Sequence, residues 1–318
     1  MIKQGLYIQS VSAINSLCSL EDEMDIVQIP LREPDYKLAI PFPMKRRRMS
    51  RIIKLGVASA LHVMKDMDCD AIITATGLGC MADTQKFYDS VIDSDEQLPN
   101  PTSFIQSTFN TIGGQIALLK GNHSYNMTHT HRGFSFENAI IDSAMKLNNK
   151  NVNNVLLGGI DEITNTQETI SRRLGIYKNH RAGEAANFFI LTNEKKEDSV
   201  RIKDIKTLYK ASNIEEDMQK FLLENNMEIS DIDIFLSGET QSKCSFKNLL
   251  VNVDKRYFKD YCGEFHTASS FAMWLGTQLL RGNYTQQMNI EPNKKLKTVL
   301  IFNNYQDINY SFLLLQSV

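Results

Sequence analysis

The segment Met49-Ser-Arg-Ile-Ile-Lys-Leu-Gly-Val-Ala-Ser-Ala-Leu-His-Val-Met-Lys65 is followed, after a gap of five residues, by Ala71-Ile-Ile-Thr-Ala-Thr-Gly77. The first segment predicts a helix, because small and apolar residues recur along one of its faces at Ile52, Ile53, Gly56, Ala60 and Met64. The second segment is apolar and stops at a glycine, which predicts a buried strand. Strands that are apolar throughout belong to sheets that helices cover on both faces.

The same order of elements occurs twice along the chain. In the first half, a second helix over 134–147 leads into a strand over 154–159. In the second half, helices and strands alternate again over 215–225, 233–238, 267–280 and 298–302. We therefore predict a duplicated α/β protein, a layered α/β/α/β/α sandwich with halves at 1–195 and 196–318. The charged stretch 193–198 at the join is expected to be a solvated hairpin.

Composition and charge narrow the class of protein. The 318 residues are 42% hydrophobic and 23% charged, enough for a sizeable core. A formal charge of −2 argues against nucleic-acid binding, and no apolar run approaches the roughly 18 residues of a membrane span. The first residues lack the pattern of a signal peptide. The five cysteines form no CxxC pair, which favours reduced thiols. We expect a cytoplasmic globular protein without metal or cofactor.

Several segments in chain order carry a family resemblance. They are a first strand beginning at Tyr7, the helix around 47–55, the segment Phe104-Ile-Gln-Ser-Thr-Phe-Asn-Thr-Ile-Gly-Gly-Gln115, the pair Gly158-Gly159 and the strand Arg181-Ala-Gly-Glu-Ala-Ala-Asn-Phe-Phe-Ile. Over nearly its whole length the sequence resembles the β-ketoacyl synthases, which have the thiolase-like fold. The resemblance implies that the segment from Phe104 crosses a dimer interface.

The resemblance also implies where catalytic residues should stand. The family uses a cysteine at the start of the first buried helix as acyl acceptor, together with two histidines that assist decarboxylation and stabilise the oxyanion. Counting back 25 residues from Gly158 places Gly133 at the cysteine position. Ser237 stands in place of the first histidine, and His266 retains the second. This pattern predicts that the chain does not condense acyl groups alone.

The surroundings of His266 also depart from the family pattern. Tyr261 stands where the family has a lysine, and Phe265 stands where it has a glycine. The glycine-rich gating loop near the C-terminus is replaced by the segment 302–309. The resemblance also implies an acyl pocket and a subunit interface. The residues that we assign to them are Phe104, Phe109, Asn110, Phe134 and Tyr305.

Three other residues remain candidates for a catalytic role. Ser135 could be acylated with His131 as its base, Cys80 could be a displaced nucleophile, and His266 could keep a catalytic role. The alternative for each is structural: a helix residue, a buried thiol and a hydrogen-bonded remnant. His129 and His131 would point the same way in an extended segment, but a metal site would need a third ligand.

The basic run Lys45, Arg46, Arg47 and Arg48 is expected to begin the first helix. It is either a solvated surface or a docking patch for an acidic acyl carrier protein or a partner subunit.

A ketosynthase-like chain without its nucleophile resembles the chain length factors of type II polyketide systems, and most of all the ketosynthase-like proteins of aryl-polyene and flexirubin pigment clusters. The resemblance implies a partner, either an active ketosynthase or a second copy of this chain, and an acyl carrier protein. Two alternatives stay open. One is a stand-alone thiolase-fold acyltransferase or decarboxylase, and the other is a non-catalytic, acyl-binding homodimeric scaffold.

Overall fold

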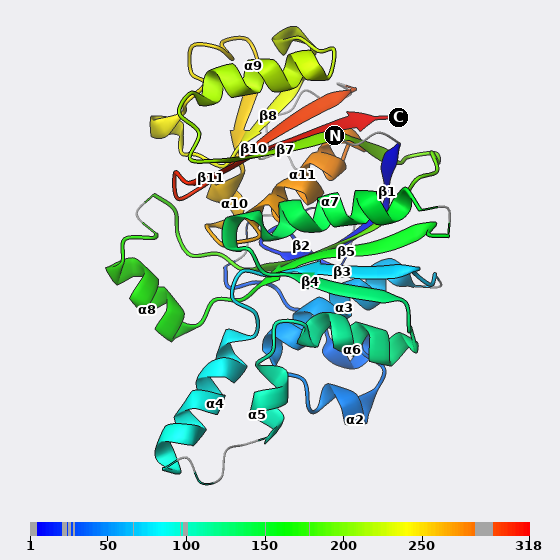
Figure 1. Cartoon of the computed structure of the whole chain (residues 1–318), viewed down its shortest axis with the longest axis vertical. Helices are drawn as coiled ribbons and strands as arrows, with labels where there is room; N and C mark the ends of the chain where they lie inside the picture. The colour runs from blue at the N-terminus through cyan, green and yellow to red at the C-terminus, as the bar shows by residue number, and fades with distance from the viewer. Residues whose placement is uncertain are drawn as a thin grey trace.

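The structure is a computed structural model, and it describes residues 5–20, 24, 27, 29–65, 67–95, 97, 101–149, 151–177, 179–283 and 295–318. Two layers of strands alternate with three layers of helices (Figure 1). This arrangement confirms the predicted layered α/β sandwich. Among the described residues, no helix is both long and apolar enough to span a bilayer.

The N-terminal half builds the first sheet, in the order β4–β3–β5–β6–β1. Its strands are β4 (Tyr125–His129), β3 (Ala71–Ala75), β5 (Asn154–Asp161), β6 (Ala185–Thr192) and β1 (Leu6–Asn15). The strands β4, β3 and β5 are parallel, whereas β6 is antiparallel to both of its neighbours. A two-residue strand, β2 (Cys18–Ser19), pairs with β1.

The C-terminal half repeats this order as β9–β8–β10–β11–β7. Its strands are β9 (Asp254–Tyr257), β8 (Ile234–Ser237), β10 (Thr298–Tyr305), β11 (Asn309–Ser317) and β7 (Val200–Tyr209). Again three strands are parallel, and β11 is antiparallel to both neighbours. The two sheets meet where Leu6–Ile8 of β1 pairs with Val200–Ile202 of β7.

Two buried helices, α7 (Ser135–Leu147) and α11 (Ala268–Leu280), lie between the sheets (Figure 1). Every residue of α11 except Leu280 is buried, including Trp274. Helices α3 (Arg51–Met64) and α6 (Thr111–Lys120) cover the outer face of the first sheet, and α9 (Ile214–Glu224) covers that of the second. Helices therefore cover both faces of each sheet, as expected for strands that are apolar throughout.

The remaining helices are short or peripheral. They are α1 (Tyr36–Ala39), α2 (Pro43–Arg46), α4 (Met81–Asp93), α5 (Pro101–Gln106), α8 (Asn165–Arg173), α10 (Phe258–Cys262) and the 3-10 turns η1 (Arg132–Phe134), η2 (Ile229–Asp231) and η3 (Gln241–Lys243). Helices α4 and α5 project together from the end of the molecule that carries α2 (Figure 1).

Helix α3 forms as the sequence predicts, with all five residues of the expected apolar face buried. Gly56 lets α6 approach closely, because a Cβ there would come within 2.6 Å of Ile112 Cγ2. One expectation was wrong. The basic run 45–48 does not begin this helix but lies in α2 and the turn that follows it, and α3 starts at Arg51 after Ser50.

The segment at the join of the halves also differs from expectation. Its residues 194–198 are exposed, as predicted, but it is not a hairpin. Strands β6 and β7, which it connects, each pair with β1 rather than with one another. The connection therefore passes around the end of β1. The division of the chain into domains at residue 195 stays a prediction.

A buried carboxyl group joins the two halves in the central layer. Glu137, in the first turn of α7, accepts hydrogen bonds at Oε1 from Ser311 Oγ at 2.8 Å and from Asn303 Nδ2 at 3.4 Å. Its side chain is buried, and burial raises its pKa above the usual range in spite of these hydrogen bonds. Glu137 is therefore held in its protonated form at pH values where an exposed glutamate is ionised.

This raised pKa predicts how stability depends on pH. In the unfolded chain Glu137 loses its proton near pH 4.5, whereas the folded chain retains it, so the free energy of unfolding decreases as the pH rises above 4.5. Glu137→Gln removes this loss. We expect the melting temperature of Glu137→Gln to gain on the wild type as the pH rises above 4.5, measured by thermal unfolding. A difference that does not change with pH would contradict the assignment.

Candidate functional site

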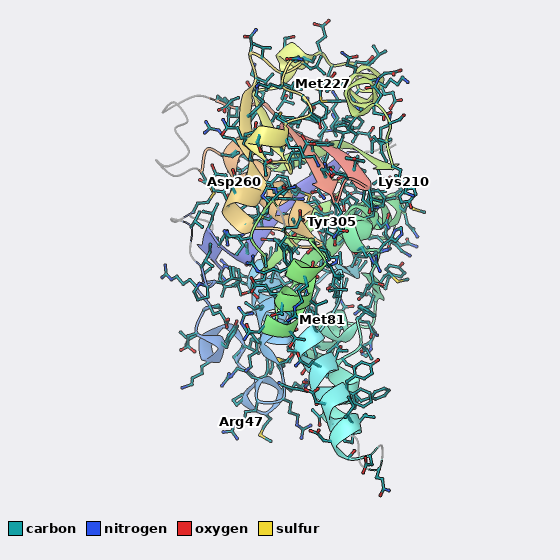
Figure 2. All side chains as sticks on the ribbon, turned by 90° about the vertical axis from the view of Figure 1, so that its left-hand side faces the viewer. Arg47, Met81, Lys210, Met227, Asp260 and Tyr305 are labelled. Atoms are coloured by element: carbon teal, nitrogen blue, oxygen red, sulfur yellow. The ribbon has the colours of Figure 1, made fainter. Side chains whose placement is uncertain are left out.

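The candidate site lies where the two buried helices begin. Helix α7 follows the turn η1, which contains Gly133, and α11 follows directly after His266 and Thr267. The ends of β3, β5 and β10 reach the same place, as the carboxyl ends of parallel strands do in layered α/β folds. Tyr305, the last residue of β10, lies near the boundary between the two halves (Figure 2).

Asp161, at the end of β5, holds these segments together. Its Oδ1 accepts hydrogen bonds from Thr76 Oγ1 at 2.9 Å and from the backbone N–H of Gly77 at 2.8 Å. Its Oδ2 accepts from the N–H of Thr267 at 2.9 Å and from Thr267 Oγ1 at 2.8 Å. A carboxylate at the start of α11 is also favoured by the helix dipole. The sequence analysis missed Asp161, although it is an acidic residue that follows an apolar strand directly.

Gly133 leaves the predicted nucleophile position without a side chain, and another residue fills the space. A Cβ at Gly133 would come within 2.6 Å of Cδ1 and Cγ of Tyr305. Tyr305 is only 5% exposed. The structure therefore brings together the residue predicted at the nucleophile position and a residue assigned to the acyl pocket or interface, with the tyrosine ring covering the glycine.

His266 stacks against the same tyrosine. The two ring centroids are 5.2 Å apart with 36° between the ring planes. On its other side the imidazole covers Gly77, where a Cβ would come within 2.0 Å of His266 Cγ. Burial lowers the pKa of His266, the charge of Asp161 acts in the opposite direction, and Arg132 lowers the pKa further. The imidazole is thus mainly neutral at pH 7, and it is half-buried between Gly77 and Tyr305.

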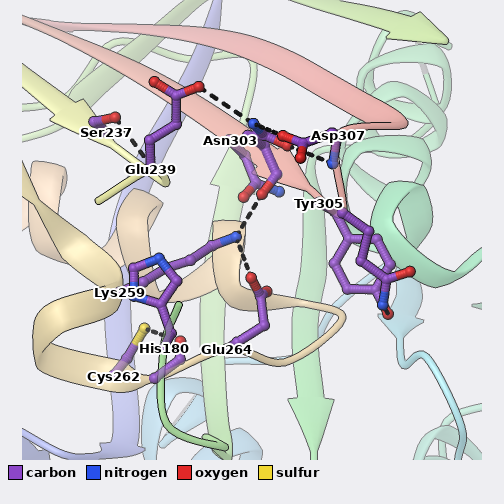
Figure 3. A network of polar contacts seen from close by, with 12 residues as sticks. His180, Ser237, Glu239, Lys259, Cys262, Glu264, Asn303, Tyr305 and Asp307 are labelled. Carbon is purple, nitrogen blue, oxygen red and sulfur yellow. Dashed lines mark hydrogen bonds and ion pairs between the residues drawn. The ribbon is translucent and has the colours of Figure 1, made fainter. Parts of the chain in front are cut away.

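Ser237, at the end of β8, is buried and accepts a hydrogen bond at Oγ from the backbone N–H of Glu239 at 3.1 Å. The carboxylate of Glu239 in turn accepts from Ser245 Oγ at 2.6 Å and from Asn304 Nδ2 at 3.2 Å. The hydroxyl predicted to stand in place of a histidine therefore stabilises a turn (Figure 3).

A buried ion pair beside the site was not predicted. Lys259, on α10, is fully buried, and its Nζ donates to Glu264 Oε2 at 2.8 Å and to the backbone oxygen of Asn304 at 2.6 Å (Figure 3). The sequence analysis treated the family's lysine as lost at Tyr261. Burial raises the pKa of Glu264, and the lysine charge opposes that increase. Removing one partner of such a pair typically costs about 3–5 kcal/mol.

The alternative nucleophiles are engaged in local structure. Ser135 Oγ donates to the backbone oxygen of Arg132 and accepts from the backbone N–H of His131, both at 2.8 Å. The imidazole of His131 contacts Asn138 instead, with Nδ1 at 3.1 Å from Nδ2. Cys80 is fully buried, and burial raises the pKa of its thiol far above the usual range. Because the thiolate is the nucleophile, Cys80 is unreactive in this environment.

His129 and His131 both reach helix α7, one turn apart. His129 Nε2 lies 3.0 Å from Asp142 Oδ2, while His131 contacts Asn138. Over the part of the chain that the structure describes, no group of three or more His, Cys, Asp or Glu side chains could hold a metal ion.

The aromatic residues assigned to the acyl pocket and interface are spread over two environments. Phe134 is buried in η1 beside His131, with ring centroids 6.0 Å apart. Phe104 is 56% exposed on α5, where its ring packs 5.2 Å from that of Phe87 on α4. Phe109 is 47% exposed and covers Gly79, where a Cβ would come within 2.8 Å of its ring. Asn110, next to it, is also exposed.

The basic run lies at the end of the molecule from which α4 projects (Figure 2). Lys45, Arg47 and Arg48 are exposed, and Arg46 is half-buried because its guanidinium donates to the backbone oxygen of Ile40 at 2.6 Å. Lys45 and Arg48 border a surface cavity of about 330 Å³, which is also lined by Met44, Met49, Thr102, Ile105, Gln106, Gln115 and Leu118.

Comparison with known proteins identifies the class. Residues 23–249 match the family described as β-ketoacyl synthase, N-terminal domain. This chain belongs to the β-ketoacyl synthase family. No curated protein matches the chain.

Solved structures with the same fold cover the full length. The ishigamide ketosynthase/chain length factor superposes with a TM-score of 0.77 at 11% identity, covering 99% of both chains. AntDE:AntF, a type II polyketide synthase acyl-carrier protein in complex with its ketosynthase bound to the hexaketide, gives 0.76 at 13% identity, covering 99% of this chain and 100% of that one. The ketosynthase ApeO in complex with its chain length factor ApeC, from Xenorhabdus doucetiae, gives 0.73 at 13% identity over 99% and 98%. These likenesses establish the thiolase-like ketosynthase fold.

The site geometry predicts that the isolated chain forms no covalent acyl intermediate. Gly133 has no side chain, Ser135 Oγ is bonded to backbone atoms on both sides, and the Cys80 thiol is protonated and buried. Incubation with malonyl- and acyl-carrier protein, followed by intact-mass spectrometry, should show only the unmodified mass. An active ketosynthase treated in parallel serves as the positive control. A stable adduct on any residue would favour a stand-alone acyltransferase.

Proposed function

We propose that this chain is a non-condensing ketosynthase-like subunit, a chain length factor that pairs with an active ketosynthase. The observation that carries the proposal is the state of the nucleophile position. The family fold is intact, yet Gly133 provides no thiol, and the Tyr305 ring covers it. A chain that retains the fold without the nucleophile can still contribute a wall and an interface to a partner's acyl tunnel.

An apolar surface supports the pairing. Large apolar side chains are exposed on α4, on the segment 101–110 and on β4, namely Tyr88, Ile92, Phe104, Ile105, Phe109 and Met127. The strand β4 also stands at one end of the strand order, with β3 as its neighbour among the described strands. Exposed apolar surface together with a sheet edge is typical of a protein interface. The solved neighbours include assemblies of a ketosynthase with a chain length factor.

The basic run 45–48 supports docking of an acidic acyl carrier protein. The exposed side chains of Lys45, Arg47 and Arg48 place three positive charges on one end of the molecule. Such a patch attracts an acidic partner and increases the rate of encounter. One neighbour is a ketosynthase in complex with an acyl-carrier protein. Within this proposal, the pathway is of the aryl-polyene or flexirubin type, as the sequence resemblance implies.

The two alternatives differ from this proposal in what covers the apolar surface and in whether the chain is acylated. In a homodimeric acyl-binding scaffold, a second copy of this chain would cover the surface around Phe104. A stand-alone enzyme would need Ser135, Cys80 or His266 to react. We rank the enzyme lowest because the Ser135 hydroxyl is bonded to backbone atoms, the Cys80 thiol is buried and the half-buried His266 ring packs against Gly77 and Tyr305.

The pairing predicts a stable heterodimer. Permanent interfaces of this kind commonly bury more than roughly 2,000 Å². Co-expression with a ketosynthase that has an intact cysteine should give a single species whose mass, by sedimentation at micromolar concentration, is the sum of the two chains, with both chains present in equal amounts by denaturing electrophoresis. A homodimer formed in preference to the mixed pair would favour the scaffold. If this chain is a monomer both when it is expressed alone and when it is co-expressed with the ketosynthase, the basis for the proposal is removed.

We predict that Phe104 influences the length of the products that the pair makes. If its exposed ring limits the partner's tunnel, Phe104→Leu should deepen that tunnel and lengthen the products, with little change in the rate of the first condensation. Because Phe104 is 56% exposed in the single chain, leucine should cost less stability than the 3–5 kcal/mol that is typical of a buried phenylalanine truncated to alanine.

Product lengths from the reconstituted pair would be measured by chromatography and mass spectrometry. Leu223→Ala, which changes an exposed apolar side chain on α9 at the opposite end of the molecule, is the matched control. Unchanged lengths in a correctly assembled Phe104→Leu pair would show that the ring serves packing only.

A further inference from the structure

Both rings at the site belong to the C-terminal half of the chain, and each packs against a glycine of the N-terminal half. His266 covers Gly77, and Tyr305 covers Gly133. An added Cβ at Gly133 would lie 2.6 Å from Cδ1 and Cγ of Tyr305 and 2.7 Å from its Cβ. Non-bonded carbon atoms reach their optimal separation only at about 3.5–4.0 Å. The tyrosine ring and a side chain at position 133 therefore exclude one another.

The atoms involved make this exclusion hard to relieve. They are the Cβ, Cγ and Cδ1 atoms of Tyr305, which are tied closely to the backbone, rather than the far end of a flexible side chain. Tyr305 is buried, and its hydroxyl accepts a hydrogen bond from Gln306 Nε2 at 3.1 Å. Moving the ring aside would require the backbone at the end of β10 to move as well.

That backbone is held by several contacts. The buried Lys259 Nζ donates to the backbone oxygen of Asn304 at 2.6 Å. Asn304 and Asp307 bond to each other twice across the turn, both at 2.9 Å, and Lys243 forms an ion pair with Asp307. The turn residues Gln306 and Asp307 have φ values of 57° and 55°, which fixes a tight reversal between β10 and β11. Tyr305 is thus anchored in the position that covers Gly133.

We propose that Tyr305 closes the acyl site of this chain by occupying the volume that a nucleophile's side chain at position 133 requires. Loss of the thiol and closure by the ring are then two separate barriers to acylation. This inference rests on the proposed function in taking position 133 as the nucleophile position. The steric exclusion between residues 133 and 305 needs no partner, so it can be tested on the isolated chain.

A double-mutant cycle tests the exclusion. Gly133→Ala should lower the melting temperature in the wild-type background, because its Cβ collides with Tyr305. In the Tyr305→Gly background, which removes the Cβ of residue 305 as well as its ring, the same change should cost nothing or increase the melting temperature. If Gly133→Ala does not fold, recovery of soluble protein by Tyr305→Gly supports the proposal. An equal loss in both backgrounds overturns it.

Thiol reactivity gives a second readout. In Gly133→Cys combined with Tyr305→Gly, the thiol sits at the start of α7, where a helix N-terminus lowers a cysteine pKa. Alkylation at residue 133 should then be at least about ten times faster than in Gly133→Cys alone. Gly114→Cys, at a position where an added Cβ meets nothing within 4 Å, is the control for a freely accessible thiol.

Peptide mass spectrometry would separate residue 133 from the five native cysteines, four of which are buried. Equal reactivity of Gly133→Cys with and without Tyr305 would overturn the proposal. The outcome is independent of the chain-length role. If no heterodimer forms, the steric exclusion between residues 133 and 305 still stands. If that exclusion is not observed, the pairing with a ketosynthase is judged on its own evidence.

Discussion

The four hydrogen bonds accepted by Asp161 are the interaction on which the rest of the site depends. One carboxylate fixes the loop after β3 through Thr76 and Gly77, and the start of α11 through Thr267. The loop belongs to the N-terminal half and the helix to the C-terminal half, so the relative position of the halves is set at this point. His266 is placed against Gly77 as a direct result, since it precedes Thr267. The buried carboxylate of Asp161 is tolerated because each of its two oxygens accepts two hydrogen bonds.

A second set of polar contacts also holds separate segments together beside the site. The ion pair of Lys259 and Glu264 lies between α10, the segment before α11 and the end of β10. Two buried charges are costly to desolvate, so their stabilising value lies in geometry rather than in net energy. The lysine reaches Asn304, whose neighbour Tyr305 then faces Gly133. The Lys259–Glu264 ion pair, the turn between β10 and β11 and the packing of Tyr305 against Gly133 are therefore connected through neighbouring residues.

The layered fold could be predicted from sequence because its signals are local. The apolar runs at 71–75 and 298–302 and the small-residue face of α3 each report burial without knowledge of their partners. The family resemblance could assign Gly133, His266 and Tyr305 to the site by their places along the chain, but not the contacts between them. Those contacts, and the position of Lys259, depend on residues close in space but distant in sequence, and no period or motif records them. The hairpin expected at 193–198 failed for the same reason, since the strand that separates β6 from β7 comes from the other end of the chain.

The central place of β1 has a consequence for synthesis on the ribosome. Leu6–Asn15 is translated long before its main partners, which are β6, ending at Thr192, and β7, beginning at Val200. Until those strands emerge, β1 is an apolar segment with exposed backbone edges, and loop closure over this distance makes its pairing slow. The first sheet cannot be completed until β6, which ends at Thr192, has been made. During synthesis the two edges of β1 therefore stay without these partners while the whole N-terminal layer between them is produced, and unpaired strand edges of this kind are open to non-native pairing.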